Sequence, residues 1–114
     1  MGFKIWENAK NDCRQKGADL TSIRSEDENN FLSSLDFSAP VIFTGGKKDG
    51  NRFTWSDGND FDYVNWASDW ASTVNDTCIV MISGTINGDD GKWGLFQCDS
   101  ALKYICKKSS KSNF

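Results

Sequence analysis

The stretch CIVMISGTINGDDGKWGLFQCDSALKYIC, residues 78–106, decides the fold because it holds three of the chain's four cysteines. The fourth, Cys13, lies near the other end of the chain. The cysteines form no Cys-x-x-Cys pair and the chain has no histidine, so the pattern does not indicate zinc. An even cysteine count favours two disulfides and an oxidising compartment; three pairings are open, and reduced buried cysteines are the alternative.

The same stretch begins and ends in predicted β-structure. Residues 78–82 are a continuous apolar run, which predicts a strand, and residues 104–106 predict a strand that closes the chain. Residues 45–91 are rich in Gly, Asn, Asp and Ser, and within them residues 53–55 are the only strand we predict before the apolar run. Long irregular segments of compact domains are usually functional when ordered, so this long loop is the first candidate binding region.

The N-terminal part predicts a first helix. Trp6, Ala9 and Cys13 recur at spacings of three and four and give that helix one apolar face. Gly17 is placed to end it in the left-handed conformation that glycine adopts without strain. Residues 20–23 then alternate apolar and polar side chains, which predicts a half-buried strand.

A second helix is predicted from a capping box. The Ser25 hydroxyl and the Glu28 carboxylate can each satisfy a free backbone amide at its start. We expect its buried stripe to consist of Phe31, Leu32 and Leu35. After Pro40, residues 41–44 predict a core strand ending at Gly45-Gly46. Two helices followed by short strands around a long loop predict an α+β fold.

Length and charge narrow the classes of protein. The chain has 114 residues, which suits one domain over residues 1–114, with a flexible tail at 107–114. Its net charge of −3 argues against nucleic acid as a partner. It contains no run of ~18 apolar residues, so we predict no membrane span. If the protein is exported, its signal has been removed.

Several motifs occur together in the order and spacing of one known family. They are Trp6-Glu7-Asn8-Ala9 before Cys13, Leu20-Thr21-Ser22-Ile23, Phe53-Thr54-Trp55-Ser56-Asp57-Gly58, Asn65-Trp66, and Gly91-Lys92-Trp93 before Cys98 and Cys106. Through them, almost the whole chain resembles the C-type lectin-like domain. The resemblance implies a C-type lectin-like fold of two helices and small antiparallel sheets around a long irregular loop.

The resemblance also assigns the cysteines and three tryptophans. It implies disulfides Cys13–Cys106 and Cys78–Cys98, the second of which ties off the base of the long loop. It places three aromatic side chains in the core: Trp55, Trp66 and Trp93. Family members usually carry a strand before the first helix, and here five residues precede Trp6. We therefore expect the final strand, residues 103–106, to be an unpaired edge. Such an edge can pair with a second copy of the chain, to give a homodimer, or with a partner chain.

The calcium motifs of the family's sugar-binding members are not matched here. Their ligands are a proline-containing tripeptide in the long loop and an Asn-Asp pair after the last tryptophan. The first position falls at Trp70-Ala71-Ser72 and the second at Gly94-Leu95, so the usual calcium ligands are absent and no cofactor is predicted. Four acidic residues remain nearby, but turn chemistry explains them better than a different ion site: Asp69, Asp76, Asp89 and Asp90.

Trp70 is the first candidate ligand-binding residue, since an aromatic ring at the lip of the loop can stack on a sugar or anchor a protein; it can equally fold inward as loop core. Asn75 and Asp76 are the other two tentative ligand-binding residues, through their polar side chains. Asn75-Asp76-Thr77 is also an N-glycosylation sequon, or a chance match in an Asn-rich loop.

These observations lead to a secreted, extracellular binding module and not an enzyme. Without histidine, the usual Ser-His-Asp and Cys-His nucleophiles cannot be built, and no pair of carboxylates stands out for glycoside cleavage. We predict carbohydrate recognition through a non-standard long-loop site. The alternative is a calcium-independent protein-interaction domain with an extracellular protein ligand.

Overall fold

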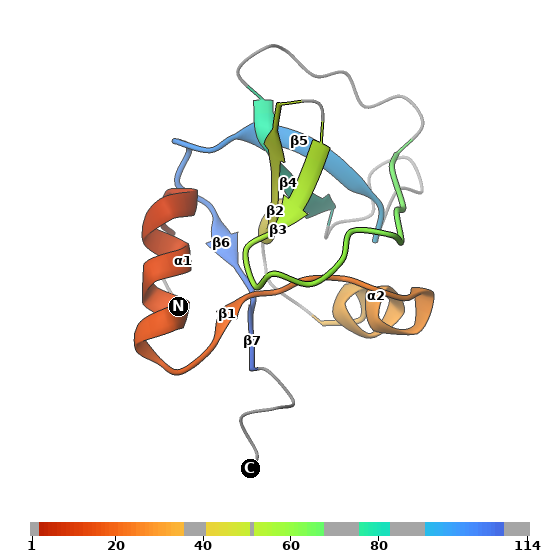
Figure 1. The fold of residues 1–114 in the computed structure, drawn as a ribbon, viewed down its shortest axis with the longest axis horizontal. Helices are drawn as coiled ribbons and strands as arrows, with labels where there is room; N and C mark the ends of the chain where they lie inside the picture. The colour runs from red at the N-terminus through yellow and green to blue at the C-terminus, as the bar shows by residue number, and fades with distance from the viewer. Residues whose placement is uncertain (1–2, 36–40, 51, 68–75, 83–90, 109–114) are drawn as a thin grey trace.

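A computed structural model describes residues 3–35, 41–50, 52–67, 76–82 and 91–108. Within them the chain forms two helices and seven strands (Figure 1). In chain order these are α1 (Trp6–Gln15), β1 (Asp19–Leu20), α2 (Glu26–Ser33), β2 (Val41–Asp49), β3 (Arg52–Trp55), β4 (Asp76–Ile82), β5 (Trp93–Gln97), β6 (Lys103–Tyr104) and β7 (Cys106–Lys107). No helix in the described ranges has the length and hydrophobicity that crossing a membrane requires.

The strands form two sheets. The larger has the order β3-β2-β4-β5 with antiparallel neighbours, and β6 joins it by pairing parallel to β2. The smaller consists of β1 and β7, paired antiparallel. In Figure 1, α1 flanks the large sheet on the left and α2 lies at the lower right, on the side of the segment that follows β3. The predicted α+β fold is confirmed.

β4 explains how one sheet serves two cores. The alternate residues Cys78 and Val80 pack with α1, whereas Ile79 and Met81 face the second cluster around Trp93. Because successive strand residues point to opposite faces, a strand that is buried on both sides reads as a continuous apolar run. That is the reason the sequence of this strand shows no alternation.

β2 continues past the point where we predicted its end. Three residues of β2 oppose one of β4 between the pairs Phe43–Val80 and Lys47–Cys78, which is a β-bulge. Inside it, the Thr44 hydroxyl donates to the Ile79 carbonyl (2.9 Å). Gly46 lies so close to Ile79 that a Cβ there would overlap the Ile79 side chain. The two glycines therefore permit close packing within the strand and do not end it.

α1 follows the sequence prediction closely. Its buried residues are Trp6, Ala9 and Cys13, and Gly17 follows the helix with a φ of 78°. The Trp6 indole nitrogen donates to the Thr44 carbonyl (2.9 Å) and so joins the helix to the bulge of β2. This bond satisfies a polar group that would otherwise be buried at a cost.

α2 begins as predicted but buries a different face. The Ser25 hydroxyl accepts from the Glu28 amide (3.1 Å), while the Glu28 carboxylate accepts from the Arg24 amide and not from the Ser25 amide. Of the predicted apolar stripe, Leu32 is buried as expected, but Phe31 is 63% exposed and Leu35 is 38% exposed. The buried residues are Asn29 and Leu32. The polar contacts of Asn29 described below set the rotation of the helix.

The structure differs from the predictions at two strands. Only residue 20 of the segment 20–23 lies in a strand, and all four residues are fully buried instead of alternating. The segment runs between layers, where the Thr21 amide donates to Ile105 and the Thr21 carbonyl accepts from Gly45. β5 was not predicted at all, because its sequence WGLFQ shows no clear period.

The final strand is not the open edge that we expected. β6 pairs with β2, β7 pairs with β1, and Lys4 and Leu102 exchange two backbone hydrogen bonds (2.9 and 3.0 Å). The few residues before α1 thus cover part of the edge. A homodimer through this strand stays a prediction. Both disulfides are present as implied: Cys13–Cys106 and Cys78–Cys98.

Candidate functional site

Trp93 organises the described parts of the long loop. Its indole nitrogen donates to the Asn29 side-chain oxygen (2.7 Å), and its backbone exchanges bonds with Asn65 and Ala67 (2.9 Å each). The side-chain amides of Asn29 and Asn65 both donate to the Gly91 carbonyl (2.9 Å). A helix, the segment before residues 68–75 and the start of β5 are therefore joined around one buried indole.

Aromatic rings surround Trp93. Edge-on contacts of 5.5 to 6.1 Å between ring centroids join it to Trp55, Phe61, Tyr63 and Trp66. Phe53 extends the cluster, with centroids 5.2 Å from Trp66 and 5.7 Å from Phe61. Burial raises the pKa of the Tyr63 phenol, and the nearby Glu26 charge adds to the increase. Aromatic pairs at these distances stabilise beyond their buried area, so the cluster is a rigid support.

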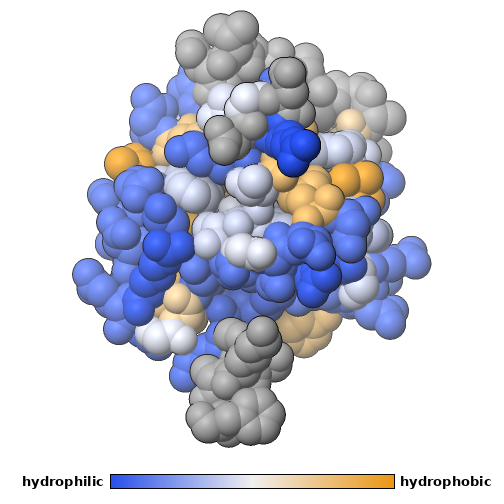
Figure 2. Space-filling model, in the orientation of Figure 1, coloured by the Kyte–Doolittle hydropathy of each residue, from blue (hydrophilic) through white to orange (hydrophobic). Residues whose placement is uncertain are grey.

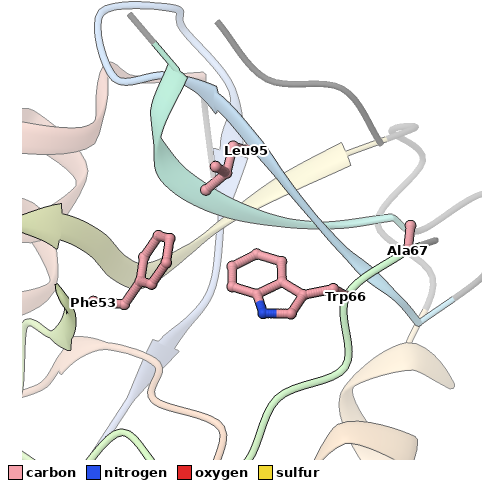
Figure 3. Close-up of a pocket in the computed structure, with 4 residues that line it drawn as sticks. All are labelled: Phe53, Trp66, Ala67 and Leu95. Atoms are coloured by element: carbon pink, nitrogen blue, oxygen red, sulfur yellow. The ribbon is translucent and has the colours of Figure 1, made fainter. Parts of the chain in front are cut away.

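A small apolar pocket opens beside this cluster. It has a volume of about 180 Å³ and is lined by Phe53, Trp66, Ala67 and Leu95. Figure 3 shows the Trp66 ring extending toward Phe53, with Leu95 above the gap between them. Trp66 was predicted to be core, as were Trp55 and Trp93; those two are buried, but Trp66 is only partly buried and forms a pocket wall.

The pocket lies at the base of the loop that carries the predicted ligand residues. Ala67 is the last residue described before residues 68–75, and β4 begins directly after them at Asp76. Trp70 and Asn75 lie outside the described residues. The backbone of Asp76 pairs with Gln97. The three predicted residues therefore stay candidates, and the pocket adds a described surface whose lining residue Ala67 directly precedes residues 68–75 in the chain.

The family's sugar-linked calcium site does not fit the residues present. At the two positions after Trp93, Gly94 is buried in β5 and the Leu95 side chain lines the apolar pocket. Neither supplies the side-chain oxygen that calcium requires. Across the described residues no three His, Cys, Asp or Glu side chains gather as a metal site; three of the acids named above lie outside them: Asp69, Asp89 and Asp90.

Sequence reasoning missed most of the pocket. Phe53 and Leu95 belong to strands β3 and β5 that do not pair with each other, and Ala67 lies in irregular chain. Nothing in the local sequence of either strand marks a residue as a pocket wall. The one usable signal in the sequence was the motif Asn65-Trp66, which lies shortly before residues 68–75.

The described part of the chain combines an α+β scaffold, two disulfides and an apolar pocket, which suits a binding module. More narrowly, residues 3–108 match the family model of the Lectin C-type domain, and the chain belongs to that family.

Relatives and solved structures agree with this assignment. The chain is 34% identical to a lectin of Pleurodeles waltl over 97% of the chain and 68% of that protein. It is 31% identical to the human versican core protein over 94% of the chain, but spans only 3% of versican's length. The crystal structure of a calcium-independent type II antifreeze protein superposes with a TM-score of 0.78 at 26% identity, covering 92% of this chain and 78% of that one.

Proposed function

We propose that the protein is a secreted module that recognises carbohydrate without calcium, through the apolar pocket together with Trp70, Asn75 and Asp76. The observation that carries this proposal is the pocket, where the partly buried Trp66 ring lies against Phe53 and Ala67 directly precedes residues 68–75 in the chain. Aromatic rings stack on the apolar faces of sugars, and rigid rings do so with little loss of conformational freedom. The name of the Pleurodeles waltl relative supports the same class of ligand.

The size of the pocket limits what enters it. Drug-sized ligands occupy pockets of about 300–1,000 Å³, so about 180 Å³ suits a single ring or one apolar group. Polar contacts must then come from the loop, where Trp70, Asn75 and Asp76 are the candidates. A glycan on Asn75 would occupy one of these candidates and hinder the ligand.

The alternative function is a calcium-independent interaction with an extracellular protein. The same pocket suits an apolar side chain, which is how protein interfaces anchor their central contacts. The calcium-independent antifreeze protein supports a domain of this fold that works without the metal.

The test is a glycan array with the oxidised full chain, probed with calcium and with a chelator. Two variants address the site: Trp70→Ala removes the candidate ring, and Ala67→Leu fills the described pocket. Ala101→Leu adds the same bulk at an exposed position and is the matched control. We expect sugar binding in both conditions, lost in the two site variants and kept in the control.

Two results would count against the proposal. An array with no reproducible sugar would favour the protein-interaction function. A thermal midpoint that rises with millimolar calcium would show a native ion site, since a ligand that binds only the folded state stabilises it. Recovery of the expressed chain from the culture medium would establish export. A mass that falls after glycosidase treatment in the parent, but not in Asn75→Gln, would establish use of the sequon.

A further inference from the structure

A second concavity, which we call the polar groove, lies between elements that do not form the apolar pocket. It measures about 910 Å³ and is bounded by the turn after α1, the start of α2, the turn after β3 and the end of β7. Its charged residues are Asp19, Arg24, Glu28, Asp57, Lys107 and Lys108. Its volume lies within the range of small-ligand sites.

The three carboxylates of the groove are already satisfied within the chain. Each accepts hydrogen bonds at both of its oxygens, at distances of 2.6 to 3.1 Å. The donors include Arg14 and Ser56 for Asp19, Ser22 and Asn59 for Asp57, and Lys107 and the Arg24 amide for Glu28. Asp19 and Glu28 are also ion-paired, with Arg14 and Lys107 respectively, whereas Asp57 accepts from neutral donors.

Two cations of the groove are uncommitted. The Lys107 ammonium is held by Glu28 (2.8 Å) and by both oxygens of Ser22 (2.8 and 3.0 Å). In contrast, the side chains of Arg24 and Lys108 are exposed and have no carboxylate partner among the described residues. Among the described residues, Arg24 and Lys108 therefore leave two positive charges in the groove against the one unpaired negative charge of Asp57, although the chain as a whole carries −3.

The remaining lining indicates the rest of the ligand. It includes no aromatic or long apolar side chain; Gly17 and Gly58 present bare backbone. The Asn59 amide nitrogen donates to Ser22 and Asp57, while its side-chain oxygen accepts no bond within the described part of the chain. The groove thus combines free cations with acceptors for hydroxyl groups, and it has no place for the apolar side chains of a peptide.

We propose that the polar groove binds an anionic saccharide, whose carboxylate or sulfate group pairs with Arg24 and Lys108 while one of its hydroxyls donates to the Asn59 side-chain oxygen. Guanidinium and ammonium groups are the usual partners of such anions. This site shares no lining residue with the apolar pocket and does not depend on the function proposed for that pocket.

The test is a titration of the oxidised full chain followed by amide NMR shifts, with glucuronate, glucose 6-sulfate and neutral glucose. We expect saturable binding of at least one anion, tenfold or more tighter than glucose, and the two anions distinguish a carboxylate from a sulfate source. Arg24→Ala/Lys108→Ala should weaken it at least fivefold. The matched double variant Lys48→Ala/Arg52→Ala removes the same charge from exposed positions of β2 and β3 and should stay within twofold.

Each contrary result overturns the proposal. If binding does not saturate, or if both double variants weaken it equally, the anion is attracted by the general charge of the protein and not by a site in the groove. Binding that is lost in Ala67→Leu and kept in the groove variant would place the anion at the apolar pocket. A short acidic peptide that binds more tightly than either sugar would make the ligand a protein segment.

Discussion

Asn29 is a polar residue at a position where an amphipathic helix normally places an apolar one. It is 3% exposed, and its side chain both accepts from Trp93 and donates to Gly91. A buried carboxamide with both ends engaged fixes a helix in one orientation, since a small rotation would break both bonds. Asn29 therefore explains why Phe31 faces solvent.

Replacing Asn29 by alanine should destabilise the protein by about 2 kcal/mol or more, because the buried indole N–H of Trp93 and one bond to Gly91 lose their partner. Urea unfolding of the oxidised chain measures the change. Asn30→Ala, at an exposed position of the same helix, should change stability by no more than about 0.5 kcal/mol. Equal effects of the two substitutions would show that the buried contact contributes little.

Tyr104 and Asp12 form a hydrogen-bonded pair that shifts the pKa of both side chains. The Tyr104 hydroxyl donates to Asp12 (2.6 Å). Burial, followed by this bond, raises the Tyr104 pKa to about 12 from an ordinary value of 10.0. The same bond, with Lys16, holds the pKa of Asp12 below 3.8.

The direction of the pH effects follows from these shifts. The contribution of Tyr104 is fully present below pH 10 and is lost as the pH rises toward 12; that of Asp12 is present above pH 3.8 and is lost as the pH falls below it. Ultraviolet titration in a Tyr63→Phe background should give a phenol pKa near 12 that Asp12→Asn lowers while leaving it above 10. A pKa near 10 in the parent would contradict the buried pair.

At the scale of elements, Gly91 connects α2 to β5. Its φ of 87° is in the left-handed region, and a Cβ built there would come within 3.0 Å of the Ser33 Cβ on α2. Its amide also donates to Ile82 at the end of β4 (2.8 Å). A helix and two strands therefore meet at a position with no room for a side chain.

Gly91→Ala should destabilise more than the same change at Gly50. Gly50 has a φ of 64° but nothing within 4 Å, so alanine there costs about 1–2 kcal/mol from the backbone alone. The contact with Ser33 should add about 1 kcal/mol at Gly91. Thermal midpoints of the two variants measure the difference. Equal midpoints would mean that α2 shifts freely to admit a methyl group.

On the scale of the whole molecule, the disulfides join parts that the sheets alone hold weakly. Cys13–Cys106 links α1 to β7 across 93 residues, and Cys78–Cys98 links β4 to the segment after β5 across 20. β1 and β7 are two residues each, so the small sheet gains support from the long-range link. Figure 2 shows the exposed hydrophobic residues on this face in small separate groups.

Removing a disulfide should destabilise the protein more when the loop that it closes is longer, although only with the logarithm of the loop length. In the chain-entropy model the losses are about 3 kcal/mol for Cys78→Ala/Cys98→Ala and about 5 kcal/mol for Cys13→Ala/Cys106→Ala. Denaturant midpoints of the paired variants measure the order. A larger loss in Cys78→Ala/Cys98→Ala than in Cys13→Ala/Cys106→Ala would show that the disulfide between β4 and the segment after β5 contributes more to stability than the one between α1 and β7.

The predictable features of this protein are those in which local sequence and burial agree. Apolar spacings of three and four predicted α1, the hydroxyl of Ser25 predicted the start of α2, and the apolar run predicted β4. Each of these features depends on residues that are near in the sequence. The rotation of α2 was missed because Asn29 bonds to residues more than sixty positions away. The period of a short helix cannot reveal such a partner.

The sequence by itself determined the α+β class, the family resemblance, the disulfide pairing that the family implies and the loss of calcium ligands after Trp93. Only the tertiary structure decided that Trp66 forms a pocket wall with Leu95, that the glycines of β2 lie in a bulge, and that the carboxylates of the polar groove are already paired. The physical reason is distance along the chain. A site is built where non-adjacent strands, turns and helix ends meet, and no local pattern records which residues will share that space.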